Sequence, residues 1–145
     1  MSFQFTLQKV MQVREREKNK VQAEYQEAIG HFEKVATQLY ELLKSKEDLE
    51  ELSRNQIATG TSIYKLQQNQ TKIMRLQQEI LEKQRATQLA REKMTVKEQH
   101  LVTKTIEVKK YEKIKQLKQE QYKEEEKRKD LMQMDELSVQ LFAKR

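Results

Sequence analysis

Apolar residues in the first third of the chain recur at alternating intervals of four and three. The series runs through Val21, Tyr25, Ala28, Phe32, Val35, Leu39, Leu42 and, after a polar break at Lys46, Leu49. Such intervals average 3.5 residues, which is the period of the seam along which two coiled-coil helices touch. The pattern therefore predicts a long helix over about residues 4–57 that packs against another helix.

A second series of mostly apolar residues recurs every seven positions further along the chain. Its members are Leu66, Ile73, Ile80, Thr87, Met94, Leu101 and Val108. The companion seam positions are expected four residues on, and they are mainly polar: Gln70, Gln77, Gln84, Arg91, Glu98 and Thr105. Polar seam residues specify register at a cost in stability. The series predicts a second helix over about residues 62–140 with a half-polar seam.

A turn is expected between the two helices at residues 57–62. Gly60 suits a helix end because glycine tolerates positive φ, and Ser62 can cap the next helix with its hydroxyl. A short turn returns the chain antiparallel to itself. The predicted fold is all-α, a long antiparallel two-helix coiled coil forming a single elongated unit over 1–145. A turn near residue 60 places Val35 opposite Gln84 and Leu7 near Glu112, and leaves residues from about 118 onward unpartnered.

Composition supports helices rather than a globular core or disorder. Charged residues make up 36% of the chain and aromatic residues 6%, with a mean hydropathy of -1.00, two glycines and no proline. This balance suits long amphipathic helices, since disordered chains are enriched in proline and glycine. There is no cysteine for a disulfide or thiolate site, and no apolar run long enough to span a membrane. The N-terminus does not resemble a secretory signal, so the cytoplasm is the default location.

No constellation of residues predicts catalysis, a metal site or a cofactor. The two histidines, His31 and His100, stand alone and are expected to be exposed helix residues. No glycine-rich phosphate loop is present. We therefore expect a protein that is not an enzyme, with no catalytic, cofactor-binding or metal-binding residues.

The net charge of +6 raises the question of an anionic partner. Residues 1–57 sum to -1 and residues 58–145 to +7, so the second helix carries the excess. Its lysine cluster is interleaved with acidic residues: Lys109, Lys110, Lys113, Lys115 and Lys118 alternate with Glu107, Glu112 and Glu120. No nucleic-acid recognition motif is present, so no specific nucleic acid is expected. A solvated helix face explains most of these charges.

Three further features bear on partners. Tyr40 and Leu43 widen the apolar stripe of the first helix, for a third surface or for extra packing against the second helix. Gly30 marks either a close helix approach or local weakness, and weakness is favoured. The chain ends with apolar residues at roughly helical spacing, which suit either a docking face or a frayed tail: Leu131, Met132, Met134, Leu137, Leu141 and Phe142.

Several stretches resemble the flagellar FliJ family. They are the start from Phe3 to Val10 with the charged segment after it, the stretch from Ile106 to Lys113, and the tail from Met134. The resemblance covers the whole chain. It implies an antiparallel coiled coil similar to that of the rotary ATPase γ subunit, in a non-enzymatic component of the flagellar type III export apparatus. It also implies a cytoplasmic location at the inner face of the cell membrane at the flagellar base.

The resemblance further implies three partners: the hexameric export ATPase, the cytoplasmic domain of the export gate, and export chaperones. Apolar residues near both chain ends are the candidates for contact with the ATPase ring: Phe3, Phe5, Leu7, Leu137, Leu141 and Phe142. The candidates for the gate contact are Gln38, Leu42, Gln70 and Leu76. The family's early aromatics in the second helix are replaced here by Asn69 and Lys72.

Two other functions remain open from the residues alone. The chain would be a generic structural coiled coil if it self-associates through its polar-tolerant seam. A non-specific nucleic-acid-binding helix is the other alternative, and it would show steeply salt-dependent binding.

Overall fold

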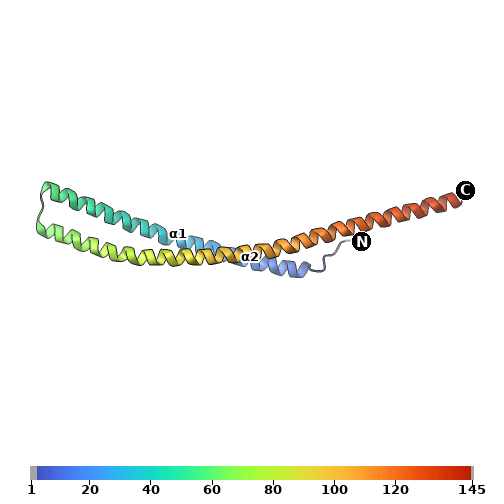
Figure 1. The fold of residues 1–145 in the computed structure, drawn as a ribbon, viewed down its shortest axis with the longest axis horizontal. Helices are drawn as coiled ribbons and strands as arrows, with labels where there is room; N and C mark the ends of the chain where they lie inside the picture. Colours follow the sequence, from blue (N-terminus) through green and yellow to red (C-terminus); the bar gives the residue numbers. More distant parts are fainter. Residues whose placement is uncertain (1–2, 145) are drawn as a thin grey trace. The chain divides into compact units, whose positions relative to one another are not determined.

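Two helices make up almost all of the chain. The computed structural model describes residues 3–144. Helix α1 spans Gln8–Thr59 and helix α2 spans Ile63–Ala143, with no strand among the described residues. The helices pack against each other as an antiparallel hairpin, which confirms the predicted all-α coiled-coil class (Figure 1). Met1, Ser2 and Arg145, which the predicted single unit 1–145 includes, lie outside the described residues.

The chain divides into two compact units, and both helices run through both of them. Unit 1 combines Met1–Lys20 with Val102–Arg145, and unit 2 is Val21–Leu101, which contains the turn. The expectation of one single unit stays a prediction.

The helix bounds differ from the predicted ones at three ends. Helix α1 begins at Gln8 rather than near residue 4. It continues to Thr59, so that only residues 60–62 are non-helical between the two helices. Helix α2 ends at Ala143 rather than near 140. The turn is short because Gly60 alone takes a positive φ, of 90°. Ser62 then caps α2, since its Oγ accepts from the Lys65 backbone amide at 3.3 Å.

The seam of α1 is the predicted one. Val21, Ala28 and Val35 are buried at seven-residue intervals, as the four–three pattern requires. On α2 the seven-residue series is also confirmed where Ile73, Ile80 and Val108 are buried. These aliphatic residues form the narrow core between the helices.

The predicted companion seam of α2 is wrong by one residue. Gln70, Gln77, Gln84, Arg91 and Glu98 are exposed, and the half-buried or buried positions are instead Asn69, Leu76, Lys83, Ala90, Lys97 and Lys104. A heptad accepts either a three-residue or a four-residue step after each seam residue. Four of the six residues at the three-residue step are polar, so the sequence signal from Leu76 and Ala90 was weak, and the packing on α1 selects that step.

Gly30 lies within α1, where an added Cβ would meet no atom within 4 Å. The other helix does not approach closely at this point. Gly30 is therefore a local weakness of the helix, in line with the interpretation favoured from the sequence.

Candidate docking surfaces

Four polar seam residues of α2, namely Asn69, Lys83, Lys97 and Lys104, contact a polar partner on α1. In unit 2, Lys97 Nζ pairs with a Glu24 carboxylate oxygen at 3.1 Å, and Lys83 Nζ donates to Gln38 Oε1 at 2.9 Å. From Glu24 to Gln38 the first helix advances fourteen residues, and from Lys97 to Lys83 the second goes back by the same number. The pairs therefore hold one constant antiparallel register through this part of unit 2.

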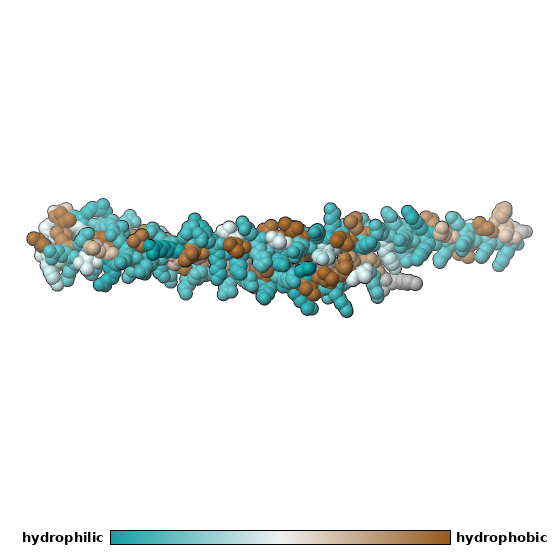
Figure 2. All heavy atoms as spheres, turned by 60° about the horizontal axis from the view of Figure 1, so that its bottom comes forward, coloured by the Kyte–Doolittle hydropathy of each residue, from teal (hydrophilic) through white to brown (hydrophobic). Residues whose placement is uncertain are grey.

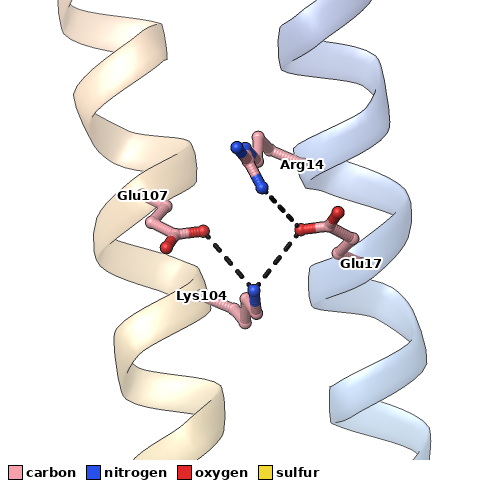
Figure 3. A network of polar contacts seen from close by, with 4 residues as sticks. All are labelled: Arg14, Glu17, Lys104 and Glu107. Atoms are coloured by element: carbon pink, nitrogen blue, oxygen red, sulfur yellow. Dashed lines mark hydrogen bonds and ion pairs between the residues drawn. The ribbon is translucent and has the colours of Figure 1, made fainter.

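In unit 1 the same role falls to a four-residue network around Glu17 (Figure 3). Glu17 Oε2 accepts from Arg14 at 3.1 Å and from Lys104 Nζ at 3.4 Å, and Lys104 also lies 3.7 Å from Glu107. The hydrogen bond from Arg14 lowers the pKa of the Glu17 carboxyl, and Lys104 lowers it further. Glu17 in turn raises the pKa of Arg14 through the same hydrogen bond. These charges join the two helices rather than forming a catalytic site.

The N-terminal residues reach further along α2 than the sequence predicts. The Phe3 ring lies 5.6 Å from that of Tyr122, tilted by 54°. The expectation that residues from about 118 onward have no partner is therefore wrong at Tyr122. Residues 3–5 are not helical, and extended chain rises roughly 3.3 Å per residue against 1.5 Å in a helix, so they cover more of α2. Burial of the Tyr122 hydroxyl raises its pKa, and the negative charge of Glu126 raises it further.

The non-helical residues 3–5 form an N-terminal arm, and the three N-terminal candidates for the ATPase-ring contact lie in it or beside it. Phe3 and Phe5 are half-buried, and Leu7 is exposed. Phe3 and Phe5 line a depression of about 940 Å³ between the arm and α2, which Lys115 and Gln119 close on the other side. The arm therefore presents aromatic surface beside lysine and glutamine side chains.

The three C-terminal candidates lie apart from the arm. Leu137, Leu141 and Phe142 are exposed, like every residue of α2 from 127 to the end of the description. Leu137 follows Tyr122, the residue that Phe3 contacts, by fifteen positions, which is roughly 22 Å of helix. The predicted ring-contact residues thus form two groups, one at each chain end, and the two groups do not meet.

The four candidates for the gate contact also fall into different surroundings in unit 2. Gln38 is engaged with Lys83, and Leu42 is half-buried in the seam. Gln70 lines one depression, of about 390 Å³, that includes Ile57. Leu76 lines another, so the four residues do not form one continuous surface.

The depression that contains Leu76 is the larger of the two. It measures about 610 Å³ and is lined by Leu49, Leu52 and Leu76 with Ser45, Asp48, Lys72 and Arg75 at its edges. Lys72 thus borders this groove as a charge. The sequence analysis missed Leu52 and Arg75, which lie off the seam and are recognised only when the two helices are placed together.

Tyr122 was missed as well, although the sequence holds a signal for it. Lys115 and Tyr122 continue the seven-residue series that ends at Val108. Extending that series by two steps would have placed Tyr122 on the inner face of α2.

Residues 3–144 contain neither a metal-binding group of side chains nor a membrane-spanning helix. No group of three or more His, Asp or Glu side chains is placed to hold a metal ion there. None of the helices in this range is long and apolar enough to cross a membrane.

The fold and these surfaces define an antiparallel coiled-coil hairpin protein with several exposed apolar surfaces. Residues 3–145 match the family described as "Flagellar FliJ protein". The chain is also 32% identical to the flagellar FliJ protein of Bacillus subtilis (strain 168) over 142 residues, which covers 98% of this chain and 97% of that protein. No solved structure matches the chain. The chain belongs to the flagellar FliJ family, whose members are structural flagellar proteins and not known enzymes.

Proposed function

We propose that the protein is a non-enzymatic stalk and tether of the flagellar type III export apparatus, coupling the export ATPase ring to the export gate. Its proposed place is the cytoplasm, at the inner face of the cell membrane at the flagellar base, and escort of export chaperones is part of the role. Membership of the family over almost the whole chain carries the proposal, since it supports a flagellar, export-related protein.

The proposed ring contact uses the two apolar groups of unit 1. Leu137, Leu141 and Phe142 are exposed on α2, beyond Tyr122, and no described residue of α1 covers them. The N-terminal group with Phe5 and Leu7 lies further back along α2. A ring that surrounds this end of the chain would therefore contact the two groups at depths roughly 20–30 Å apart along the helix.

The proposed gate contact uses the groove at Leu76 together with Leu42, Gln38 and Gln70. A groove with an apolar floor and charged edges suits an amphipathic partner surface. The charge of Lys72 at its edge favours an acidic group on the gate at that point.

The test is the mass of the complex that the chain forms with a purified export ATPase and nucleotide, measured by light scattering. One copy per hexamer supports the stalk. Because the two apolar groups lie apart, Phe5→Ala and Leu141→Ala are tested separately, and each should weaken binding about tenfold while helicity by circular dichroism is unchanged. Leu89→Ala, which truncates an exposed leucine in unit 2, is the matched control and should bind normally.

Two results would count against the proposal. A chain that does not bind the ATPase and runs as a dimer in dilute solution would favour a generic self-associating coiled coil. If Leu89→Ala weakens binding to the ATPase as much as Leu141→Ala does, the ring contact cannot be assigned to the chain ends.

A further inference from the structure

The turn end of unit 2, defined as residues 52–78, has a charge composition unlike the rest of the chain. It contains four basic residues, Arg54, Lys65, Lys72 and Arg75, and no acidic residue. All four are exposed, and none forms an ion pair with another residue of the described chain. Elsewhere on the inner face of α2, Lys97 and Lys104 pair with Glu24 and Glu17 across the two helices, and Lys83 donates to Gln38. The turn end thus carries a net positive charge, with Glu50 and Asp48 at the edges of its two depressions.

The same surface exposes large apolar side chains on both sides of the turn. Ile57 is 63% exposed on α1, and Ile63 and Tyr64 are 74% and 68% exposed at the start of α2. Figure 2 shows hydrophobic side chains gathered at the end where the turn lies, at the left of the view. Single exposed apolar residues are ordinary on protein surfaces, but three within eight positions at a turn form a patch.

The fold keeps these side chains outward. Just inside the turn, Asn69 is buried and donates from Nδ2 to Gln56 Oε1 at 2.8 Å, and Ile73 fills the next seam position. The seam is therefore occupied without Ile63 or Tyr64, which point away from it. Since Ser62 caps the first turn of α2, the exposed pair lies on an ordered helix end.

We propose that the turn end binds an anionic lipid surface, with Ile57, Ile63 and Tyr64 entering the headgroup region and the four basic residues facing acidic headgroups. Tyrosine is enriched at membrane interfaces because its ring is apolar and its hydroxyl is polar. Basic side chains near an anionic leaflet add electrostatic attraction that acts within about one Debye length. The ring-contact residues lie in unit 1, whereas Gln70 and Leu76 of the proposed gate contact lie within residues 52–78, so the test rests on Ile63 and Lys65, which take no part in that contact. The inference adds a direct lipid contact to the membrane location of the proposed function, and vesicle binding tests it apart from binding to the ATPase or the gate.

A lipid surface suits these residues better than an acidic peptide or a nucleic acid. The most exposed apolar groups flank the turn itself, whereas a peptide needs a groove to receive its side chains. The two depressions nearby each include an acidic residue, Glu50 in one and Asp48 in the other, which disfavours an acidic peptide there. Phosphate binding to a nucleic acid would leave the isoleucines without a role.

The test uses the full chain and vesicles of phosphatidylcholine with phosphatidylglycerol, against vesicles of phosphatidylcholine alone. We expect co-sedimentation with the anionic vesicles only, weakened by salt. Ile63→Ser should lower the affinity about tenfold, and Lys65→Gln about fivefold. The matched controls are Val96→Ser, which alters an exposed apolar residue away from the turn, and Lys109→Gln, and both should bind as the parent does.

A second measurement uses the absence of tryptophan from the chain. Ile63→Trp should show a blue-shifted emission on adding anionic vesicles, and Val96→Trp should not. The proposal is overturned if the parent does not bind anionic vesicles, or if Ile63→Ser and Lys65→Gln bind them as tightly as the controls. It is also overturned if the turn-end variants lose binding to polyglutamate or DNA while their vesicle binding is unchanged.

Discussion

Asn69 offers the sharpest test of how the two helices are held together. It is 8% exposed and is the buried polar residue of the described chain, lying on the seam of α2. Its amide donates to Gln56 Oε1 across the helices at 2.8 Å. We predict that replacing it by leucine stabilises the protein. The substitution loses the hydrogen bond of the Asn69 amide and gains the free energy of burying a leucine side chain.

The magnitude comes from two opposing contributions. Losing one neutral hydrogen bond costs about 1 kcal/mol. Burying a leucine side chain at the same seam position contributes about 1.5–3 kcal/mol. Gln56 is only half-buried, so its amide can turn to water and is not left unsatisfied. Asn69→Leu should therefore raise the free energy of unfolding by about 0.5–2 kcal/mol.

The assay is urea unfolding followed by far-UV circular dichroism. Asn69→Leu should move the midpoint upward with an unchanged slope, which identifies a stability change rather than a change in the surface exposed. Asn69→Ala is the matched control, since it removes the hydrogen bond without adding apolar area, and it should lose about 1 kcal/mol. A lower midpoint for Asn69→Leu would refute the reasoning, because position 69 would then require a polar contact rather than tolerate one.

Three further predictions concern the core, the backbone and the charges. Ile80→Ala should cost about 2–4 kcal/mol on urea unfolding because Ile80 is buried, whereas Leu81→Ala, on an exposed neighbour, should change stability by less than about 0.5 kcal/mol; similar losses would contradict the seam. Gly30→Ala should stabilise α1 by about 0.5–1 kcal/mol in the same assay, and Gly60→Ala should destabilise by about 1 kcal/mol because its φ is positive; equal effects would contradict the turn geometry. Arg14 lowers the pKa of the Glu17 carboxyl in the folded protein below its ordinary value of 4.5. The ionised carboxylate therefore stabilises the folded protein above pH 4.5, and this stabilisation is lost as the pH falls through the lowered pKa. In thermal melts Glu17→Gln should be less stable than the parent at neutral pH and equal to it in strong acid, and a constant difference at all pH values would contradict this.

The sequence alone determined the helices, the turn and half of the seam. Helix formers fill the chain without proline, Gly60 is the residue that takes a positive φ, and the series through Val21 and Ile73 are mostly apolar, with polar members at Lys46 and Thr87. Local propensity and period are enough for these features because they depend on neighbours within one or two turns.

Tertiary structure decided the rest, because the sequence offered equivalent choices. Asn69 and Gln70 are both polar, so only packing against Gln56 on α1 shows that Asn69 faces inward. The contact of Phe3 with Tyr122 depends on an extended arm whose path no periodic pattern records. The two apolar groups at the chain ends remain apart because α2 continues from Tyr122, the point that the arm reaches, to Ala143.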